Sequence, residues 1–571
     1  MAFITHRTSR GKKYWSIVES RRVNGKPRQI ILEYLGTAET LLARLTQEKQ
    51  LSLKSYSHGD SAALLNIAKE LDIVSIINRH VPKGTSGKKP QRDSLTVGAS
   101  FLLAAIGRAC RPTSKMGWYD WCQTTSMEYG LKTSLKKLDS QHFWDQMNAL
   151  PAESIPLIEE DIVKQLAKQC NVKPDTLLFD TSNFFTFIDS TNERCQLAQR
   201  GHNKQKRYDL RQIGLALLVS RKGHLPLFHR TYPGNQADVT VFKDMLGDLT
   251  KRMKAVFEEM SQVTLVFDKG NNSRDNFKAI DEKKDLHYVA GLVSSNFKWL
   301  IDDANQGFES ITLNGEEVPV YRSQEDIWGQ KRSCVVYISR QLKEGQIRGI
   351  HQQLEKKLKE LEGFKTQLEN PRSRKKMARE GIERKLKTII RGQFVGEILK
   401  TDPVELTNGA LSFSYSIDGE AFERLKNEVL GRNILITSRH DWSTEDILQA
   451  YRGQARVEYA FRNMKNPFHM AVRPQYHWTD QKIRVHILMC MIAYLLSMTA
   501  YMKARKAGYG KNPDRLLEEL GQIRLACQMK KGSRKVAYRL EQMPEDLNIL
   551  AKSLGISDEN IRLDLNISDY S

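Results

Sequence analysis

The stretch TLLFDTSNFFTFID, residues 176–189, is rich in apolar and β-branched side chains and carries a carboxylate, Asp180, near its middle. A run of this length and composition is typical of a strand buried in a sheet. Two similar runs follow, LRQIGLALLVS at 210–220 and LPLFHRTYPGN at 225–235. The sequence therefore predicts three strands in succession.

After residue 235 the pattern changes to one in which helices and strands alternate. We expect a helix at 238–254, a strand at 263–268 (VTLVFD), a helix from Ser273 and a strand at 287–293 (HYVAGLV). Three successive strands followed by this alternation is the element order of an RNase-H-like α/β core with a mixed five-stranded sheet. In such a sheet the first and fourth strands are neighbours, which brings Asp180 close to Asp268.

Two aspartates on neighbouring strands predict a cation site. Asp180 is costly to bury in a central strand unless a positive charge meets it. Asp268 ends its strand, where open α/β sheets place their ligand sites, although capping of the following turn would also explain it. The two like charges need a counter-charge, and oxygen-only ligands favour Mg²⁺ or Mn²⁺ over zinc.

A second stretch, STEDILQAYRGQARVEYAFRNMKNP at 443–467, predicts one helix of about six turns, because it starts with a capping box and ends with Asn-Pro. At ~100° per residue, four of its polar side chains fall within about 60° of arc. They are Tyr451, Gln454, Glu458 and Lys465. Glu458 could complete the cation site, or it could simply pair with Arg462 one turn later.

The remaining sequence divides into regions by periodicity, loops and charge. We expect a basic β-hairpin region at 1–58, a helical domain at 59–172, the first part of the core at 173–294, a β-rich insertion at 295–440 with a helical hairpin at about 341–391, the second part of the core at 441–505 and a C-terminal region at 506–571. The hairpin turns at Asn24-Gly25, and its basic residues fit either a DNA backbone or a solvated edge. We expect the helical domain to bind DNA, although dimerisation or packing on its neighbour would fit the same pattern.

Composition restricts the class of partner. The formal net charge of +22 favours a polyanion such as nucleic acid, although a basic soluble protein without such a partner is an alternative. The longest apolar run, 487–500, is too short to span a bilayer, and the N-terminus lacks the apolar core of a signal peptide. The seven cysteines include no C-x-x-C, so neither a disulfide framework nor a zinc module is indicated. We therefore expect an intracellular protein without a membrane partner.

The chain resembles the DDE transposases of bacterial insertion sequences, in their IS-four-like superfamily. Members carry the motif Tyr-x2-Arg-x3-Glu-x6-Lys, which reads Tyr451, Gln454, Glu458 and Lys465 here, with glutamine in place of arginine. The blocks SRRVNGKPRQIILEYLG, RGHNKQKRYDLRQIGLALLVSRKGHLPLFHRTYPGNQAD and VFDKGNNSRDNF are also similar, so the likeness covers most of the chain. The replaced arginine would hold DNA phosphate, and Arg462 is better placed around the helix to do so than Arg452 or Arg456.

The resemblance implies Mg²⁺-dependent cleavage at the inverted-repeat ends of a mobile element and transfer of the freed strand to target DNA. Asp180, Asp268 and Glu458 would be the catalytic residues and the metal ligands, with Mn²⁺ able to substitute for Mg²⁺. The residues expected to bind DNA are Tyr451, Lys465, Gln454, Arg462, Lys204, Lys206 and Arg207. The partners would be double-stranded DNA and a second copy of the chain in a synaptic dimer, in the cytoplasm of a bacterium and associated with its nucleoid.

Two other readings use the same residues differently. A non-mobile nuclease of the same fold would hydrolyse DNA without joining it. A catalytically idle DNA-binding protein derived from a transposase would only bind, but binding alone gives no reason to keep three carboxylates placed for metal. Asp209 is a further acidic candidate, for which pairing with Arg207 or Arg211 is the simpler explanation.

Overall fold

The computed structural model describes the chain except residues 1, 24–25, 47–50, 83–94, 137, 174, 190, 258–262, 371–376, 407–410, 467–471, 473–475, 531–535 and 565–571. The chain divides into two compact units, which are described separately. One unit comprises residues 1–66, 120–136 and 503–571, and the other comprises residues 67–119 and 137–502. The predicted turn at Asn24-Gly25 lies outside the described residues.

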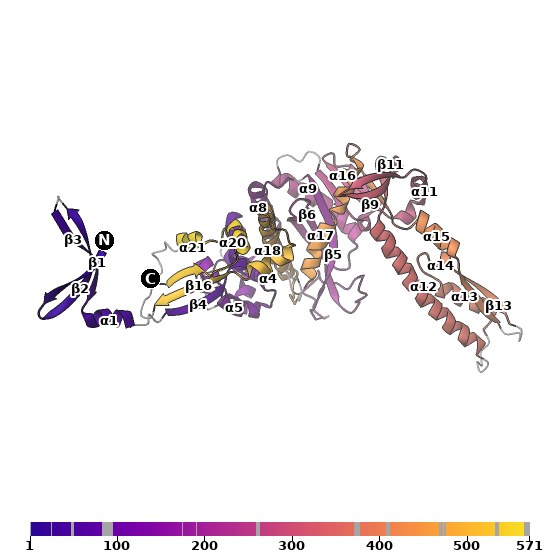
Figure 1. The fold of residues 1–571 in the computed structure, drawn as a ribbon. Coiled ribbons are helices and arrows are strands. Elements are labelled where there is room, and N and C mark those ends of the chain that lie inside the picture. The colour runs from indigo at the N-terminus through magenta and orange to yellow at the C-terminus, as the bar shows by residue number, and fades with distance from the viewer. Residues whose placement is uncertain are drawn as a thin grey trace. The chain divides into compact units, whose positions relative to one another are not determined.

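A nine-stranded mixed sheet is the centre of the larger unit (Figure 1). Its strands are β5 (Thr176–Thr186), β6 (Arg211–Ser220), β7 (Pro226–Pro233), β8 (Val263–Phe267), β9 (Leu286–Leu292), β10 (Glu309–Leu313), β11 (Glu316–Ile327), β12 (Gln330–Ile338) and β15 (Arg432–Thr437). They lie in the order β10-β11-β12-β15-β9-β8-β5-β6-β7. Only β5, β8 and β9 pair in parallel, and the other pairings are antiparallel.

The five strands predicted for the core are present and contiguous, and β5 pairs with β8 as expected. The predicted limit of five strands is wrong, because four strands from 295–440 extend the same sheet instead of forming a separate β-rich layer. The physical reason is the edge of β9, whose unpaired backbone groups are satisfied by antiparallel pairing of Ile434–Thr437. Part of the insertion therefore extends the central sheet, and the rest of it forms a separate arm.

Helices cover both faces of the sheet. Alternate residues of β5 point to opposite faces, so Phe179 and Phe184 mark the two sides. Phe242 of α9 (Asp238–Val256) packs edge-on against Phe179 with ring centroids 5.1 Å apart. Phe461 of α17 (Ala455–Lys465) packs against Phe184 at 6.4 Å. The two helices thus approach the same strand from opposite sides.

The arm leaves the sheet after β12 and returns to it at β15. It consists of α12 (Arg340–Glu369), α13 (Arg379–Ile389), α14 (Val395–Ile398), the hairpin of β13 (Leu399–Glu405) with β14 (Leu411–Ile417), and α15 (Gly419–Glu428). Helices α12 and α13 form the predicted helical hairpin and contribute Leu361, Phe364 and Ile382 to an apolar core of the arm's own. The two ends of the arm meet, because Ser339 N–H donates to Gly431 O at 2.8 Å.

The stretch 443–467 forms two helices, so the prediction of one continuous helix is wrong. Helix α16 (Thr444–Arg452) begins at the expected cap, where Ser443 Oγ accepts from Asp446 N–H. Around Gly453 the backbone switches to i→i+3 bonds, such as Gln454 N–H to Tyr451 O at 2.9 Å, before α17 begins. This tighter turn changes the direction in which later side chains point.

The other described helices of the larger unit are α3 (Ile73–Arg79), α4 (Val97–Cys110), α7 (Ser140–Ala149), α8 (Ser154–Cys170), the short η1 (Lys269–Asn271), α10 (Arg274–Asp281), η2 (Ser294–Asn296) and α11 (Lys298–Gln306). Helix α18 (Asp480–Lys506) has the length and apolar composition of a membrane span, but 89% of its most apolar window is buried within the protein. That burial is typical of a core helix.

In the smaller unit, the predicted N-terminal hairpin is β2 with β3, and β1 adds a third strand that the prediction missed. The elements are β1 (Ala2–Ser9), β2 (Lys12–Val23), β3 (Lys26–Gly36), α1 (Ala38–Thr46), β4 (Leu51–Ser57), α2 (Gly59–Glu70), α5 (Lys115–Thr124), α6 (Met127–Leu131), α19 (Pro513–Leu520), β16 (Arg524–Lys530), β17 (Val536–Leu540), α20 (Glu545–Ser553) and α21 (Asp558–Asp564). Strand β4 pairs with β16, so N-terminal and C-terminal segments share one sheet.

A buried ion network joins helix α8 to the central sheet. Glu159 of α8 accepts from Arg252 of α9 at 2.7 Å and pairs with His229 of β7, and all three side chains are less than 9% exposed. Although burial opposes ionisation of Glu159, His229 and Arg252 together lower its pKa. The charges therefore stabilise the fold only as a complete set.

We expect Glu159→Gln to lower the free energy of unfolding by about 3–5 kcal/mol at neutral pH, because Arg252 then keeps a buried charge without its partner. Urea unfolding measures this. The difference from wild type shrinks as pH falls through the lowered pKa of Glu159, since the wild-type carboxylate then becomes protonated. Glu160→Gln, a more exposed neighbour 3.5 Å from Arg252, is the control and is expected to cost about 1 kcal/mol or less. Equal losses of unfolding free energy in both variants would contradict the role of Glu159 as the buried partner of Arg252.

Candidate active site

The candidate site lies where β5 and β8 separate. The two strands pair from Thr176 with Thr264 up to Phe179 with Phe267, and the pairing ends there. Asp180 and Asp268 are the next residues on the two strands. A cavity of about 890 Å³ opens at this point. The sheet therefore places both aspartates at the mouth of one gap, at the carboxyl end of β8 where ligand sites are expected.

The cavity is lined by side chains from strands, loops and two helices. Its lining residues are Asp180, Thr181, Ser182, Asn183, Asn203, Lys204, Gln205, Asp238, Asp268, Gly270, Asn271, Glu458, Phe461, Arg462, Lys465 and Asn466. The structure thus places the three carboxylates predicted to be catalytic around one cavity, although Asp180 lies 88 positions before Asp268 and Asp268 lies 190 positions before Glu458. Four carboxylates, two lysines and one arginine therefore line the same cavity.

Asp180 is the most strongly perturbed of these carboxylates. Burial, together with the negative charges of Asp268, Glu458 and Asp238, raises its pKa to about 7, while a hydrogen bond from Thr181 N–H opposes this shift. The Thr181 bond is 2.8 Å long. A carboxyl group in this position gains its charge easily only when a cation is close.

Asp268 caps the turn that follows β8, which is one of the two explanations that the sequence left open, and it also lines the cavity. Its Oδ1 accepts from Lys269 N–H at 2.7 Å, which caps the short helix η1. The same oxygen accepts from Tyr451 Oη at 3.3 Å. Burial and then the charge of Asp268 raise the pKa of Tyr451, so the phenol stays protonated and donates. Gly291 of β9 is needed here, because a Cβ would lie 2.5 Å from that hydroxyl.

Gln454 does not face the cavity as the continuous-helix prediction required. The side chain is 6% exposed, and its Nε2 donates to Phe179 O at 2.8 Å. Phe179 directly precedes Asp180 on β5. The burial does not favour the predicted DNA contact. The glutamine instead fixes the start of α17 to the strand that carries the first aspartate.

Helix α17 carries the other predicted residues into the cavity. Glu458 is exposed on its cavity side, and Lys465 Nζ bonds Ser182 Oγ of β5 and lies 5.4 Å from the centroid of the Phe184 ring. The Arg462 guanidinium lies 5.0 Å from the centroid of the Tyr459 ring. Among the described ion pairs, none joins Glu458 to Arg462, so the simple pairing that the sequence left open is not seen.

The three basic residues predicted in the loop before β6 have different surroundings. Lys204 lines the cavity. Lys206 and Arg207 are exposed, and Arg207 forms two hydrogen bonds with Asp209, at 2.8 and 2.6 Å. The Arg207 guanidinium lowers the pKa of Asp209 to about 2. Asp209 is therefore the partner of Arg207, as the simpler explanation held.

Asp238 was not predicted from the sequence. It is the first residue of α9, lines the cavity, and accepts a hydrogen bond from Tyr232 Oη at 2.9 Å. The signal was present in the block ending PGNQAD, but an acidic residue at the start of a helix is ordinarily explained by the helix dipole. Only the folded chain shows that this helix starts beside the aspartates.

The donor chemistry of the cavity fits a hard divalent cation, because its acidic side chains offer only oxygen ligands. Within the part of the chain that the structure describes, no three His, Cys, Asp or Glu side chains gather closely enough to hold a metal ion. The carboxylates thus surround the cavity without closing on one point. The fit rests on their oxygen chemistry and on the raised pKa of Asp180, which a cation would relieve.

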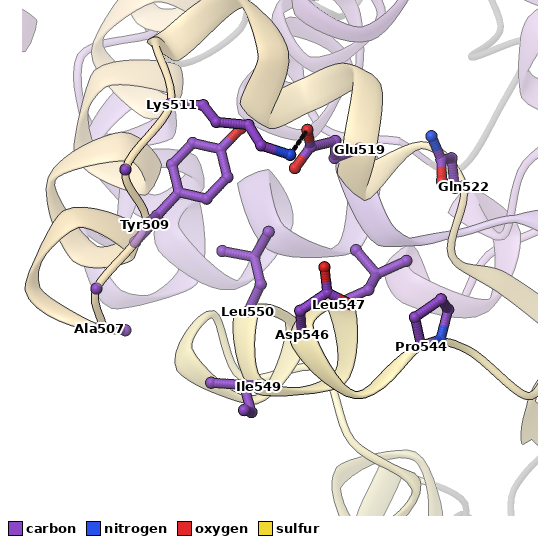
Figure 2. Close-up of a pocket in the computed structure, with 13 residues that line it drawn as sticks. Ala507, Tyr509, Lys511, Glu519, Gln522, Pro544, Asp546, Leu547, Ile549 and Leu550 are labelled. Carbon is purple, nitrogen blue, oxygen red and sulfur yellow. Dashed lines mark hydrogen bonds and ion pairs between the residues drawn. The ribbon is translucent and has the colours of Figure 1, made fainter.

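A second cavity, of about 500 Å³, lies in the smaller unit (Figure 2). Leu547, Leu550 and the ring of Tyr509 form part of its wall. Lys511 and Glu519 on its rim pair with each other at 2.7 Å. The paired charges leave this cavity without the set of carboxylates that distinguishes the first.

Comparisons with known proteins agree with the resemblance. Residues 185–496 match the family model described as the transposase DDE domain, and residues 4–58 match the N-terminal domain of IS1634 family transposases. The first match includes Asp268 and Glu458 and begins just after Asp180. None of the curated proteins matches this chain.

Among solved structures, the chain is similar to a piggyBac transposase in a synaptic complex with hairpin DNA, determined by cryo-EM. The identity is 10%, and the similarity covers 80% of this chain and 79% of that chain with a TM-score of 0.36. A likeness this distant does not establish a shared arrangement.

We expect Gln454→Ala to lower the free energy of unfolding by about 1–3 kcal/mol, because Phe179 O loses a buried hydrogen-bond donor. The matched control is Gln449→Ala, an exposed glutamine on α16, which is expected to change stability by about 0.5 kcal/mol or less. Urea unfolding of both variants measures the difference. A Gln454→Ala variant as stable as the control would mean that this contact does not anchor α17.

Proposed function

Because the chain belongs to the family of transposases with a DDE domain, which act on DNA, we propose that it binds the terminal inverted repeats of an insertion sequence, cuts the DNA there and joins the freed ends to a target. The observation that carries this proposal is the cavity at the split between β5 and β8, where Asp180, Asp268 and Glu458 lie together. The strand order β9-β8-β5-β6-β7 supports an RNase-H-like core for this chemistry.

DDE domains depend on divalent metal ions, and we infer that Mg²⁺ or Mn²⁺ is held here by Asp180, Asp268 and Glu458. When bound, such ions supply a site that activates the attacking oxygen and stabilises the leaving oxygen of a phosphodiester. Asp268 is held for this task by Tyr451 and by the backbone of η1. Asp180 is held by the backbone of β5, whose Phe179 carbonyl is fixed by Gln454.

The phosphate groups of DNA would be met by the basic side chains of the cavity. Lys465, Arg462 and Lys204 line it together with the carboxylates. Lys465 is oriented by Ser182 of β5, so its ammonium group is held beside the strand that carries Asp180. The net charge of +22 would add a general attraction to DNA. A homodimeric synaptic complex in the bacterial cytoplasm, associated with the nucleoid, belongs to the same proposal.

We expect Asp268→Asn and Asp180→Asn each to abolish cleavage of a fragment that carries the element's ends in Mg²⁺, while binding of those ends persists. The reason is that each change removes a charged metal ligand but leaves the basic residues in place. Asp244→Asn, an exposed change on α9 away from the cavity, is the control and is expected to cut normally. Cleavage by Asp268→Asn at the wild-type rate would exclude this active site.

The same assay separates transposition from simple nuclease action. Pre-cut ends incubated with wild-type protein and plasmid target should yield joined products, because the proposed enzyme transfers strands as well as cutting them. Cutting without joining would favour a nuclease.

We expect Lys465→Ala to weaken binding of the element's ends and to reduce the slope of log affinity against log salt by about 1, because one phosphate contact is lost. Fluorescence anisotropy at several salt concentrations measures the slope. Lys269→Ala, an exposed lysine beside Asp268 that does not line the cavity, is the control. An unchanged slope in Lys465→Ala would remove this lysine from the DNA contacts.

A further inference from the structure

Asp238 is held by a side chain that the proposed chemistry does not yet use. Tyr232 of β7 is 4% exposed, and its hydroxyl donates to Asp238 Oδ1 at 2.9 Å. The ring lies across Gly214, its partner on β6, and a Cβ at Gly214 would come within 2.0–2.4 Å of three ring carbons. The glycine is therefore required for this tyrosine to lie in its present position.

The Tyr232 hydroxyl is the donor in its hydrogen bond with Asp238. An ionised carboxylate only accepts hydrogen bonds, so the phenol that contacts Asp238 Oδ1 at 2.9 Å supplies the proton. A buried donor that fixes one oxygen of a carboxylate leaves the other oxygen, Oδ2, available to a ligand. This is the arrangement in which metal-binding carboxylates are commonly found, with an outer partner orienting the ligand.

Asp238 reaches the cavity from the side opposite to Glu458. Helix α9 packs on the face of β5 marked by Phe179, and α17 packs on the face marked by Phe184. Both helices nevertheless contribute a carboxylate to the same cavity, because β5 and β8 no longer pair beyond Phe179. The helix dipole alone would explain an acidic residue at this position, but it gives no reason for a buried tyrosine that orients it.

We propose that Asp238 is a fourth metal-binding carboxylate of this site, and that Tyr232 is the residue that positions it. The inference rests on the proposed function, because it concerns the same divalent cations. Asp238 would hold an ion on the α9 side, across the gap from Glu458.

Binding of Mn²⁺ to the DNA-free, full-length protein tests this directly, with free Mn²⁺ measured by electron paramagnetic resonance. We expect Asp238→Asn to weaken binding at least ~10-fold or to remove one binding site, as loss of a ligand should. Tyr232→Phe, which keeps the ring over Gly214 and removes only the hydroxyl, should weaken binding by a smaller factor. Asp244→Asn on the same helix should bind as wild type does. Circular dichroism and unfolding curves establish that each variant is folded.

The possible outcomes are distinguishable. Wild-type affinity and stoichiometry in Asp238→Asn, together with loss of binding in Asp180→Asn, would overturn the role of Asp238 and leave the proposed function standing. No Mn²⁺ binding by the wild-type protein would count against both. If Asp238→Asn does not fold, Tyr232→Phe decides, and wild-type binding in that variant would overturn the inference.

Discussion

The separation of two parallel strands is the constraint on which the site depends. While β5 and β8 remain paired, their side chains lie on closed faces of the sheet and helices cover them. Where the pairing ends, Asp180 and Asp268 follow on the two strands, and both line the cavity. Two further side chains of the site are positioned by contacts with these two strands. Tyr451 holds the second aspartate, and Gln454 fixes α17 to the strand just before the first.

The carboxylates that line the cavity are unfavourable for folding, but they suit a site that binds a cation. A mostly buried carboxyl group beside three other carboxylates is unfavourable as an anion, which is why the pKa of Asp180 is raised to about 7. The hydrogen bond from Thr181 N–H opposes this shift only in part. The surrounding packing of Phe242, Phe179 and Phe267 supplies the stability that keeps such a group in place. A site of this kind gains most from a ligand that brings positive charge.

Much of this arrangement could be predicted from the sequence. Apolar runs of strand length predicted β5 to β9 in order. Because the first and fourth strands of such a sheet are neighbours, the same pattern predicted that Asp180 and Asp268 lie close together. The break at Gly453 could not be predicted, because its i→i+3 bonds satisfy the same backbone groups as a helix and leave the hydrophobic pattern intact. The direction of Gln454 was wrong for that reason. Asp238 was missed because its local sequence has a complete explanation as a helix start, and its neighbours come from distant strands.

The arm formed by α12 to α15 leaves and rejoins the sheet at two antiparallel neighbours, β12 and β15, whose ends are bridged by Ser339 and Gly431. Both chain ends of the excursion are therefore fixed by the sheet, whatever lies between them. The arm also carries an apolar core of its own, to which α12, α13, α14 and α15 all contribute. It is a module that evolution could lengthen, shorten or exchange among related mobile elements while the chemistry beneath stays intact.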